Sequence, residues 1–275
     1  MLTEAQLSCF KTFGYVVMKQ VFSPAELRTL NSEFDRTLTE QYAHQPFDGT
    51  KRHWSMLMDE ATPFFAGLIE DPRFLKPAQQ MYGDSVLGIM VDGNRYVGNT
   101  PWHPDSNSAL QYGVKFAIYL QPVGAETGAL RVIPGSHRLP LEQNAEFAAG
   151  VQKLPITEVP ATVLASTPGD VVAFDLRLWH GSWGGQTDRR MCTIVYYNDP
   201  QTPEEIAYLR QQAVDNINNA VASFDAKRKY FFSQHWLANA QRNPDRQRWI
   251  DRLRELHYFD APGIVEPAEN VVAAR

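Results

Sequence analysis

The chain has 275 residues, a length that allows one large domain or two small ones, and 44% of them are hydrophobic, enough for a sizeable core. Its formal net charge of −5 argues against nucleic acid as a partner, and no run of apolar residues is long enough to predict a transmembrane helix. The N-terminus lacks the pattern of a secretory signal, and two lone cysteines, Cys9 and Cys192, fit a reducing cytoplasm better than a disulfide framework.

The first third of the chain is expected to be mainly helical. Thr3 can cap a short helix that stops near Gly14, and Ser23-Pro24-Ala25-Glu26 is a capping box that starts a second helix. Asp71-Pro72 is expected to start a third helix that runs to about residue 82 and is kinked or split by Pro77.

A polar and aromatic stretch, residues 43–56, separates the second and third helices and is typical of a loop. It carries Lys51 and Arg52, which would suit the mouth of a substrate site. A solvated surface loop is the simpler interpretation and is favoured.

The middle of the chain is expected to be rich in strands. Apolar runs bounded by turn residues predict strands at 15–21, 85–91, 95–97, 113–120, 129–133, 171–178 and 191–197. Asp92-Gly93-Asn94 is expected to form a turn between two of them, and residues 139–168 a partly ordered insertion over the site.

Helical patterns return after residue 200. Thr202-Pro203-Glu204-Glu205 is a capping box for a helix to about residue 224, and further helices are expected at 227–240 and 244–259, with a frayed tail from Gly263. We therefore expect one domain over residues 1–275, mostly β, with a core at about 85–200 and helices before and after. Short antiparallel strands with Gly/Pro turns fit a jelly roll, although the pattern alone leaves a sandwich or another barrel open.

The most informative motif is Trp102-His103-Pro104-Asp105. In an extended strand, His103 and Asp105 leave the same face, so an imidazole nitrogen and a carboxylate oxygen can reach one metal ion. They would supply two ligands of the 2-His-1-carboxylate triad of non-haem iron oxygenases, and His180 fits the third.

This pattern alone is weak evidence. Seven histidines and 31 acidic residues in the chain predict about 0.8 chance matches to His-x-Asp/Glu. Its neighbourhood is more specific, because the segment from Gly128 to His137 follows about 25 residues later and Gly169-Asp170 leads a strand into His180. His137 within the first of these is expected to be an exposed loop residue and not a ligand.

Together these motifs resemble the phytanoyl-CoA dioxygenase family of Fe(II)/2-oxoglutarate oxygenases over roughly residues 10–200. The matching motifs are Phe13-Gly14-Tyr15-Val16-Val17, Ser23-Pro24-Ala25-Glu26-Leu27, Trp102-His103-Pro104-Asp105, residues 128–137, Gly169-Asp170, His180-Gly181-Ser182 and the arginine that follows. The resemblance implies a double-stranded β-helix that binds Fe(II) through His103, Asp105 and His180. It also implies 2-oxoglutarate as cosubstrate, O2, succinate and CO2 as co-products, and a small or medium organic substrate.

The resemblance also implies how the cosubstrate is held. An arginine after the second histidine binds its far carboxylate, and alignment favours Arg189 over Arg190, although strand alternation does not decide between them. Ser182 would add a hydrogen bond, whereas Pro104 stands where the family often carries a glutamine. Asp105 favours hydroxylation over halogenation, because related halogenases carry a small residue there; desaturation or ring formation stays open.

The sequence leaves two other functions open: an iron oxygenase that does not use 2-oxoglutarate, and a non-catalytic jelly-roll module that binds a ligand. It does not name the substrate. Lys51, Arg52, Arg95 and Lys115 suggest that the substrate carries an anionic group.

Overall fold

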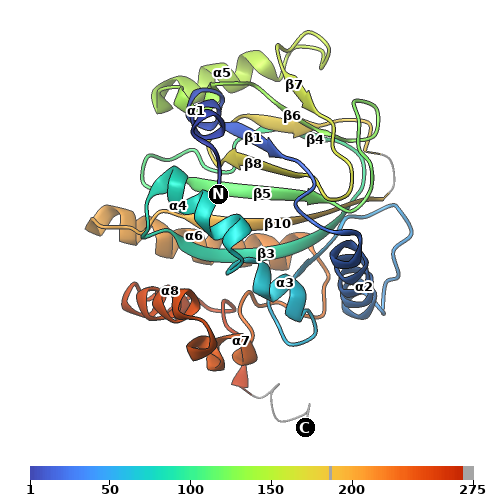
Figure 1. The fold of residues 1–275 in the computed structure, drawn as a ribbon. Coiled ribbons are helices and arrows are strands. Elements are labelled where there is room, and N and C mark those ends of the chain that lie inside the picture. Colours follow the sequence, from blue (N-terminus) through green and yellow to red (C-terminus); the bar gives the residue numbers. More distant parts are fainter. Residues whose placement is uncertain (186–187, 269–275) are drawn as a thin grey trace.

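A computed structural model describes residues 1–185 and 188–268 and, within them, two antiparallel β-sheets (Figure 1). The larger sheet has the strand order β1-β8-β5-β10-β3-β2, and the smaller has the order β4-β9-β6-β7. The strands are β1 (Tyr15–Met18), β2 (His53–Met56), β3 (Leu87–Tyr96), β4 (Thr100–His103), β5 (Gly113–Tyr119), β6 (Leu130–Val132), β7 (Thr162–Leu164), β8 (Val171–Asp175), β9 (His180–Ser182) and β10 (Arg189–Tyr197). This is the predicted jelly roll with flanking helices.

The predicted caps of the first helices are confirmed. Thr3 and Ser23 each accept a hydrogen bond from the third helical residue and form capping boxes, and Gly14 ends the first helix with φ 83°. The helices of the described residues are α1 (Glu4–Phe13), α2 (Pro24–Gln41), α3 (Pro63–Leu68), α4 (Pro72–Tyr82), α5 (Asn144–Val151), α6 (Pro203–Ser223), α7 (Gln234–Ala238) and α8 (Pro244–Glu255). None of them is both long and apolar enough to cross a membrane.

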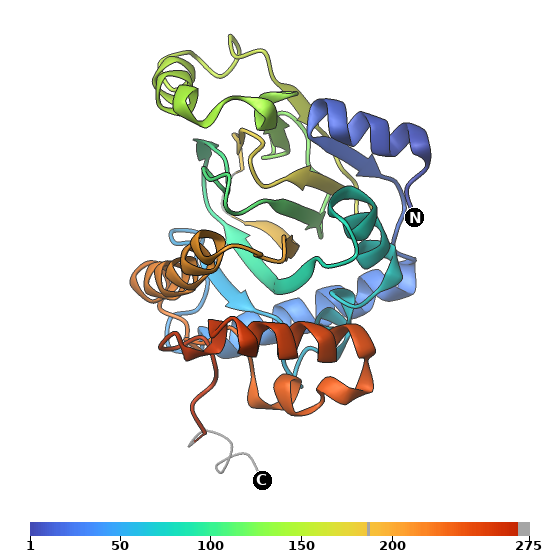
Figure 2. The same ribbon diagram turned by 90° about the vertical axis from the view of Figure 1, so that its left-hand side faces the viewer.

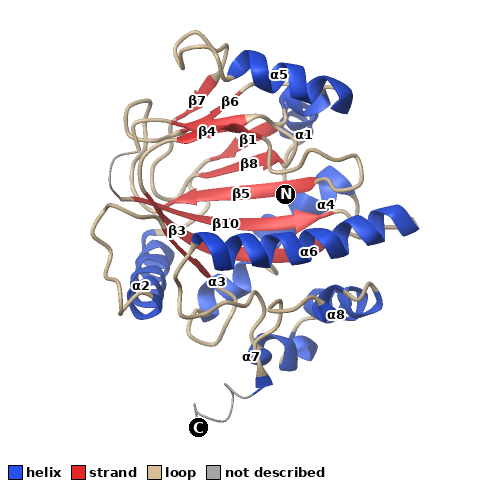
Figure 3. Cartoon of the chain, turned by 180° about the vertical axis from the view of Figure 1, so that it is seen from behind, coloured by secondary structure: helices blue, strands red, loops and turns tan. Residues whose placement is uncertain are grey.

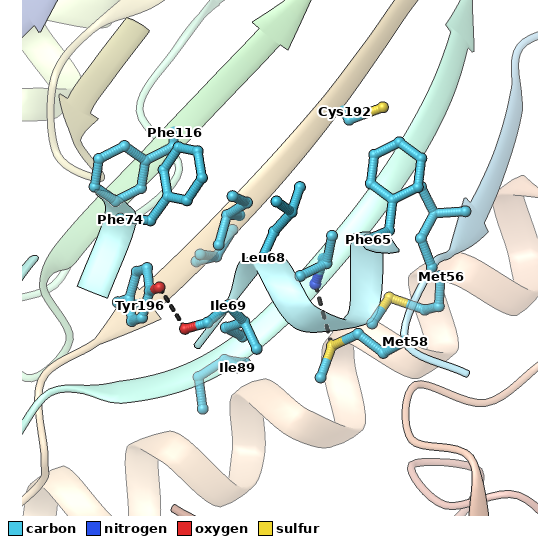
Figure 4. Packing of buried hydrophobic residues seen from close by; sticks show 14 of the residues in the cluster. Met56, Met58, Phe65, Leu68, Ile69, Phe74, Ile89, Phe116, Cys192 and Tyr196 are labelled. Atoms are coloured by element: carbon cyan, nitrogen blue, oxygen red, sulfur yellow. Dashed lines mark hydrogen bonds between the residues drawn. The ribbon is translucent and has the colours of Figure 1, made fainter. Parts of the chain in front are cut away.

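The main core lies between the outer face of the larger sheet and the helices that cover it. Phe74 of α4 packs edge-on against Phe116 of β5, with ring centroids 5.4 Å apart (Figure 4). The buried Tyr196 hydroxyl of β10 donates to the carbonyl of Ile69 at the end of α3, at 2.6 Å. Helices α1 and α5 lie at the end of the molecule near the smaller sheet, and α8 lies at the opposite end (Figure 2).

The predicted turn at residues 92–94 is wrong, because β3 runs through it without interruption. Asp92 points to the inner face, where it accepts hydrogen bonds from the Trp54 indole at 2.6 Å and from the Thr193 hydroxyl. Gly93 points to the outer face, where a Cβ would come within 3.0 Å of the Phe34 ring. Residue types that usually form turns therefore lie in a strand here, because Asp92 provides hydrogen-bond acceptors on the inner face and Gly93 leaves space for Phe34 on the outer face.

The loop predicted over residues 43–56 is correct only for its first part. Its last four residues form β2, which pairs with β3 at the edge of the larger sheet. The strand is anchored by Tyr42, whose hydroxyl donates to the Trp54 carbonyl at 2.9 Å. All four side chains of β2 are buried, which is why this short segment is a strand and not a solvated loop.

Two further helical expectations need correction. Pro77 does not split α4; the helix continues through it, and burial of Phe74, Leu75 and Ala78 offsets the lost backbone hydrogen bond. Residues 139–168 are ordered: they contain α5 and β7, and α5 packs through Phe147 against Trp179, with ring centroids 5.3 Å apart. Helix α5 packs behind the smaller sheet and β7 forms an edge of that sheet, so the segment does not line the cavity described below.

The C-terminal helices are shorter than predicted. The helix expected at 227–240 is confined to α7, and α8 ends before His257, whose φ is 55°. The segment expected to fray at Gly263 is packed up to Glu266, because the buried Ile264 carbonyl accepts hydrogen bonds from the backbone of Phe231 and Phe232, both at 2.9 Å. The remainder of the predicted frayed tail, residues 269–275, lies outside the described residues.

Candidate active site

Three potential metal ligands converge where the two sheets face each other. His103 ends β4 and pairs directly with His180 at the start of β9. Asp105 lies two residues beyond His103, with its Oδ1 4.0 Å from His103 Nε2 and its Oδ2 3.9 Å from His180 Nε2. All three ligand atoms lie within 4.8 Å of one another, so one metal ion could contact all of them.

Both histidines are held through Nδ1, which leaves Nε2 of each ring available to bind a metal. Nδ1 of His103 lies 2.8 Å from the Pro101 carbonyl, and Nδ1 of His180 lies 2.8 Å from the Leu178 carbonyl. A backbone carbonyl can only accept, so each Nδ1 carries the proton and each Nε2 presents its lone pair toward Asp105. Burial lowers the pKa of His180 to about 4, which keeps the ring neutral, the form that binds a metal.

Asp105 also forms a partly buried ion pair with Lys115 of β5, whose Nζ lies 2.8 Å from Oδ2. Burial opposes ionisation of the carboxyl group, but the adjacent ammonium outweighs it and holds the pKa of Asp105 at about 2. The carboxylate is therefore charged over the physiological range. The donor set of two neutral imidazoles and one carboxylate fits Fe(II).

A cavity of about 190 Å³ extends from the three ligands between the inner faces of the two sheets. The larger sheet contributes Lys115, Ala117, Tyr119, Phe174, Arg189, Met191 and Thr193, and the smaller contributes Thr100, Leu130, Gly181 and Ser182. Strand alternation explains the lining of β10, since Arg189, Met191 and Thr193 face the cavity and Cys192, Ile194 and Tyr196 join the outer core. The register therefore puts Arg189 inside and Arg190 outside.

Arg189 is a buried cation without an anionic partner among the described residues. The residue is 2% exposed, and its Nη2 donates to the Thr100 hydroxyl at 3.3 Å, while Nε and Nη1 have no hydrogen-bond partner within residues 1–185 and 188–268. Burial lowers the pKa of the guanidinium. Burying a charge and two donors without compensation costs several kcal/mol, on the order of 1–3 kcal/mol for each unsatisfied donor, so this end of the cavity is suited to a carboxylate ligand.

Two glycines make room for that guanidinium. A Cβ at Gly128 or Gly185 would collide with Arg189 Nη1, and Gly128 also has φ 85°, a backbone conformation that favours glycine. Ser182 is buried beside the same part of the cavity, and so is Tyr119, whose pKa burial raises to about 12. Tyr119 was missed by sequence reasoning, although its two-residue spacing from Ala117 and Lys115 marks the inner face of β5.

Of the other residues singled out in the sequence, some line the cavity and some do not. Arg52 and Lys115 line the cavity, whereas Lys51 is exposed and Arg95 forms an ion pair with Asp188 at 2.6 Å. The prediction that His137 is exposed is wrong. The residue is buried in a 3-10 turn, with Nε2 3.4 Å from the Lys11 carbonyl. It does not line the cavity.

A jelly roll that presents two histidines and a carboxylate beside an unpaired buried arginine defines a non-haem iron oxygenase with an anionic cosubstrate. The sequence profile of the phytanoyl-CoA dioxygenase (PhyH) family matches residues 10–192, a span of 183 of the 275 residues. The chain belongs to this family and is a non-haem Fe(II)- and 2-oxoglutarate-dependent dioxygenase.

The chain is similar to two ectoine dioxygenases at low sequence identity. The chain is 25% identical to the ectoine dioxygenase of Sphingopyxis alaskensis over 71% of this chain and 76% of the relative. It is 22% identical to the ectoine dioxygenase of Bordetella bronchiseptica over 66% of this chain and 70% of that protein.

Solved structures share the fold. The carbocyclase SnoK from nogalamycin biosynthesis superposes with a TM-score of 0.60 at 20% identity, over 72% of this chain and 85% of SnoK. EctD from S. alaskensis, solved with 2-oxoglutarate and 5-hydroxyectoine, gives a TM-score of 0.57 at 22% identity, over 72% of this chain and 77% of EctD.

Proposed function

We propose that the chain hydroxylates a C–H bond of a small or medium organic substrate, with His103, Asp105 and His180 as the iron ligands. The overall reaction converts substrate C–H, O2 and 2-oxoglutarate into C–OH, succinate and CO2. O2 is the oxidant; bound iron would activate it, and 2-oxoglutarate would supply two of the four electrons that O2 takes up. The observation that carries the proposal is the convergence of the three ligand atoms within 4.8 Å, with both Nε2 lone pairs free.

The residues of the chain would divide the remaining tasks. Arg189, with Thr100 and Ser182 beside it, would bind the far carboxylate of 2-oxoglutarate through charge-assisted hydrogen bonds. Leu130 and Met191 would exclude water from that part of the cavity. Asp105 favours hydroxylation over halide transfer, because its carboxylate takes the position that a halide would need.

The test is succinate release, measured together with oxidised product for a panel of small organic substrates. We expect a substrate to raise succinate formation above the uncoupled rate and to gain one oxygen atom from O2. Asp105→Gly should lose most of this hydroxylation. If that variant hydroxylates as well as the unchanged protein, Asp105 is not an iron ligand. Product formation without succinate would favour an oxygenase that does not use 2-oxoglutarate.

A further inference from the structure

A second cavity, of about 320 Å³, adjoins the one that contains the iron ligands. Arg52, Asp92, Asp105 and Lys115 line both cavities and mark their shared boundary, whereas Arg189 lines only the first. The second cavity thus reaches the carboxylate ligand without including the arginine proposed for 2-oxoglutarate. Its volume is in the range of small-molecule sites.

One wall of this cavity comes from α6, through Asn216, Asn219, Ala220 and Ser223. Figure 3 shows this helix running along β10 and β3, beyond the region covered by the smaller sheet. Helix α6 lies outside residues 10–192, the part of the chain that matches the family profile. This wall can therefore set a preference that belongs to this chain and not to the family as a whole.

Three side chains of the lining, Gln111, Lys115 and Arg52, offer hydrogen-bond donors to a ligand. Gln111 is 4% exposed, and its Nε2 has no hydrogen-bond partner within the described part of the chain. Lys115 has donors left after its bond to Asp105. The Arg52 guanidinium is held by the Asn94 side chain and lies 4.0 Å from the centre of the Tyr96 ring, with no carboxylate of the described residues in ion-pair contact.

The two carboxylates of the lining, Asp92 and Asp105, are already engaged. Asp92 accepts hydrogen bonds from the Trp54 indole and the Thr193 hydroxyl. Asp105 is the proposed iron ligand and forms an ion pair with Lys115. Apolar and aromatic side chains make up much of the remaining lining: Trp54, Met90, Leu176, Val195, Tyr197, Ala220, Phe224 and Phe231. A ligand that complements this lining brings acceptors and negative charge on one group and an apolar body on the rest.

We propose that this second cavity is the substrate subsite and that it takes a small organic acid with an apolar or aromatic body. The carboxylate accepts hydrogen bonds from Gln111 and pairs with Arg52, the boundary cation that has no carboxylate partner among the described residues, while the body lies against the aromatic side chains and α6. The inference rests on the proposed function and deepens it, since it names the substrate class of the same site.

The experiment uses the full chain loaded anaerobically with Fe(II) and saturating 2-oxoglutarate. Small carboxylic acids with alkyl or aryl bodies are compared with their primary amides, which keep the shape and lose the charge. Two readouts are taken: the shift of the iron–2-oxoglutarate charge-transfer band, and succinate formation after O2 is admitted. At least one acid is expected to shift the band and to stimulate succinate formation tenfold or more over its amide.

Two variants and a matched control locate the effect. Gln111→Glu replaces the buried donor with a carboxylate of the same shape and is expected to raise the half-saturating acid concentration at least tenfold. Asn216→Leu should raise it at least fivefold, whereas Asn218→Leu, on the exposed side of the same helix, should match the unchanged protein.

Equal stimulation by acids and amides, no stimulation by any acid, or loss of the charge-transfer band through displacement of 2-oxoglutarate would each overturn the inference. So would an unchanged acid requirement in both Gln111→Glu and Asn216→Leu. In each of these cases the iron–2-oxoglutarate charge-transfer band is still present before acid is added, so the proposed function stands while the inference fails. Absence of the band in the unchanged protein would instead count against the proposed function.

Discussion

Lys115 Nζ lies 2.8 Å from Asp105 Oδ2, so the carboxylate expected to bind iron is already paired with a cation. Lys115 comes from the middle of β5, and Asp105 follows β4 of the other sheet, so the ion pair links the two layers of the jelly roll at the site. The ammonium keeps the carboxyl group ionised. It also adds positive charge next to the position of a divalent metal.

The first prediction follows from that charge. In Lys115→Met the repulsion between ammonium and metal is lost while the volume is largely kept, so Fe(II) should bind about tenfold more tightly, about 1.4 kcal/mol. Anaerobic titration with Fe(II) measures this. Weaker binding in the variant would mean that Lys115 serves chiefly to orient Asp105.

The second prediction separates the two neighbouring arginines. A charge-assisted hydrogen bond contributes about 1.5–3 kcal/mol, so Arg189→Ala should raise the KM for 2-oxoglutarate at least tenfold. Arg190→Ala is the matched control, because Arg190 faces outward and pairs with Asp35 at 2.8 Å. It should change that KM little. Steady-state kinetics on both variants decide, and the reverse outcome would move the anchor to Arg190.

The third prediction concerns the glycine beside the anchor. Gly128→Ala puts a methyl group against Arg189 Nη1 at a backbone φ of 85°. We expect the free energy of unfolding to fall by about 1–2 kcal/mol and the KM for 2-oxoglutarate to rise several-fold. Thermal unfolding and kinetics on one preparation test both effects. Gly150→Ala, at a position in α5 with open space around it, is the control: it should leave the KM unchanged and should raise the free energy of unfolding, by up to about 1 kcal/mol.

Local patterns predicted the fold well wherever one signal dominated. The Thr3 cap with Gly14 located α1, capping boxes located α2 and α6, and apolar runs located β5, β8 and β10. The prediction failed at β3, where Asp92 and Asn94 resemble turn residues but act as inner-face acceptors. It failed at α7 because contacts between distant segments, such as Phe232 with Val265, hold the preceding residues extended.

The part of the candidate site that lies within sequence motifs could be predicted from motif spacing. The ligands His103, Asp105 and His180 stood in recognisable motifs, but the choice between Arg189 and Arg190 depended on strand register, which pairing with β3 and β5 sets. Gln111 and Asn216 carry no local signal. Gln111 lies between β4 and β5, and Asn216 becomes a neighbour of the site only when α6 packs against the inner face of β10.

The fourth prediction concerns stability and pH. Asp170 is buried and accepts hydrogen bonds from the Lys19 ammonium and from the backbone of Gln20 and Thr167, which joins β1 to the turn before β8. Burial opposes ionisation, but these donors outweigh it and depress the pKa of Asp170 below its ordinary value of 3.8. The folded state therefore holds its proton less tightly than the unfolded state. The stabilisation is complete above that value and is lost as the pH falls through the depressed pKa.

Asp170→Asn should accordingly lower the free energy of unfolding at pH 7 by about 2–3 kcal/mol. The difference from the unchanged protein should shrink as the pH falls below 3.8. Urea unfolding at a series of pH values measures it. A difference that stays constant down to acid pH would show that the charge of Asp170 is not what stabilises this turn.

The most direct test of the account is anaerobic titration of the protein with Fe(II) and then 2-oxoglutarate, followed by absorption spectroscopy. One equivalent of Fe(II) should bind, and 2-oxoglutarate should produce a metal-to-ligand charge-transfer band that is lost in His180→Ala. A band of native intensity in His180→Ala, or no band in the unchanged protein, would contradict the assignment of His103, Asp105 and His180 as the iron ligands.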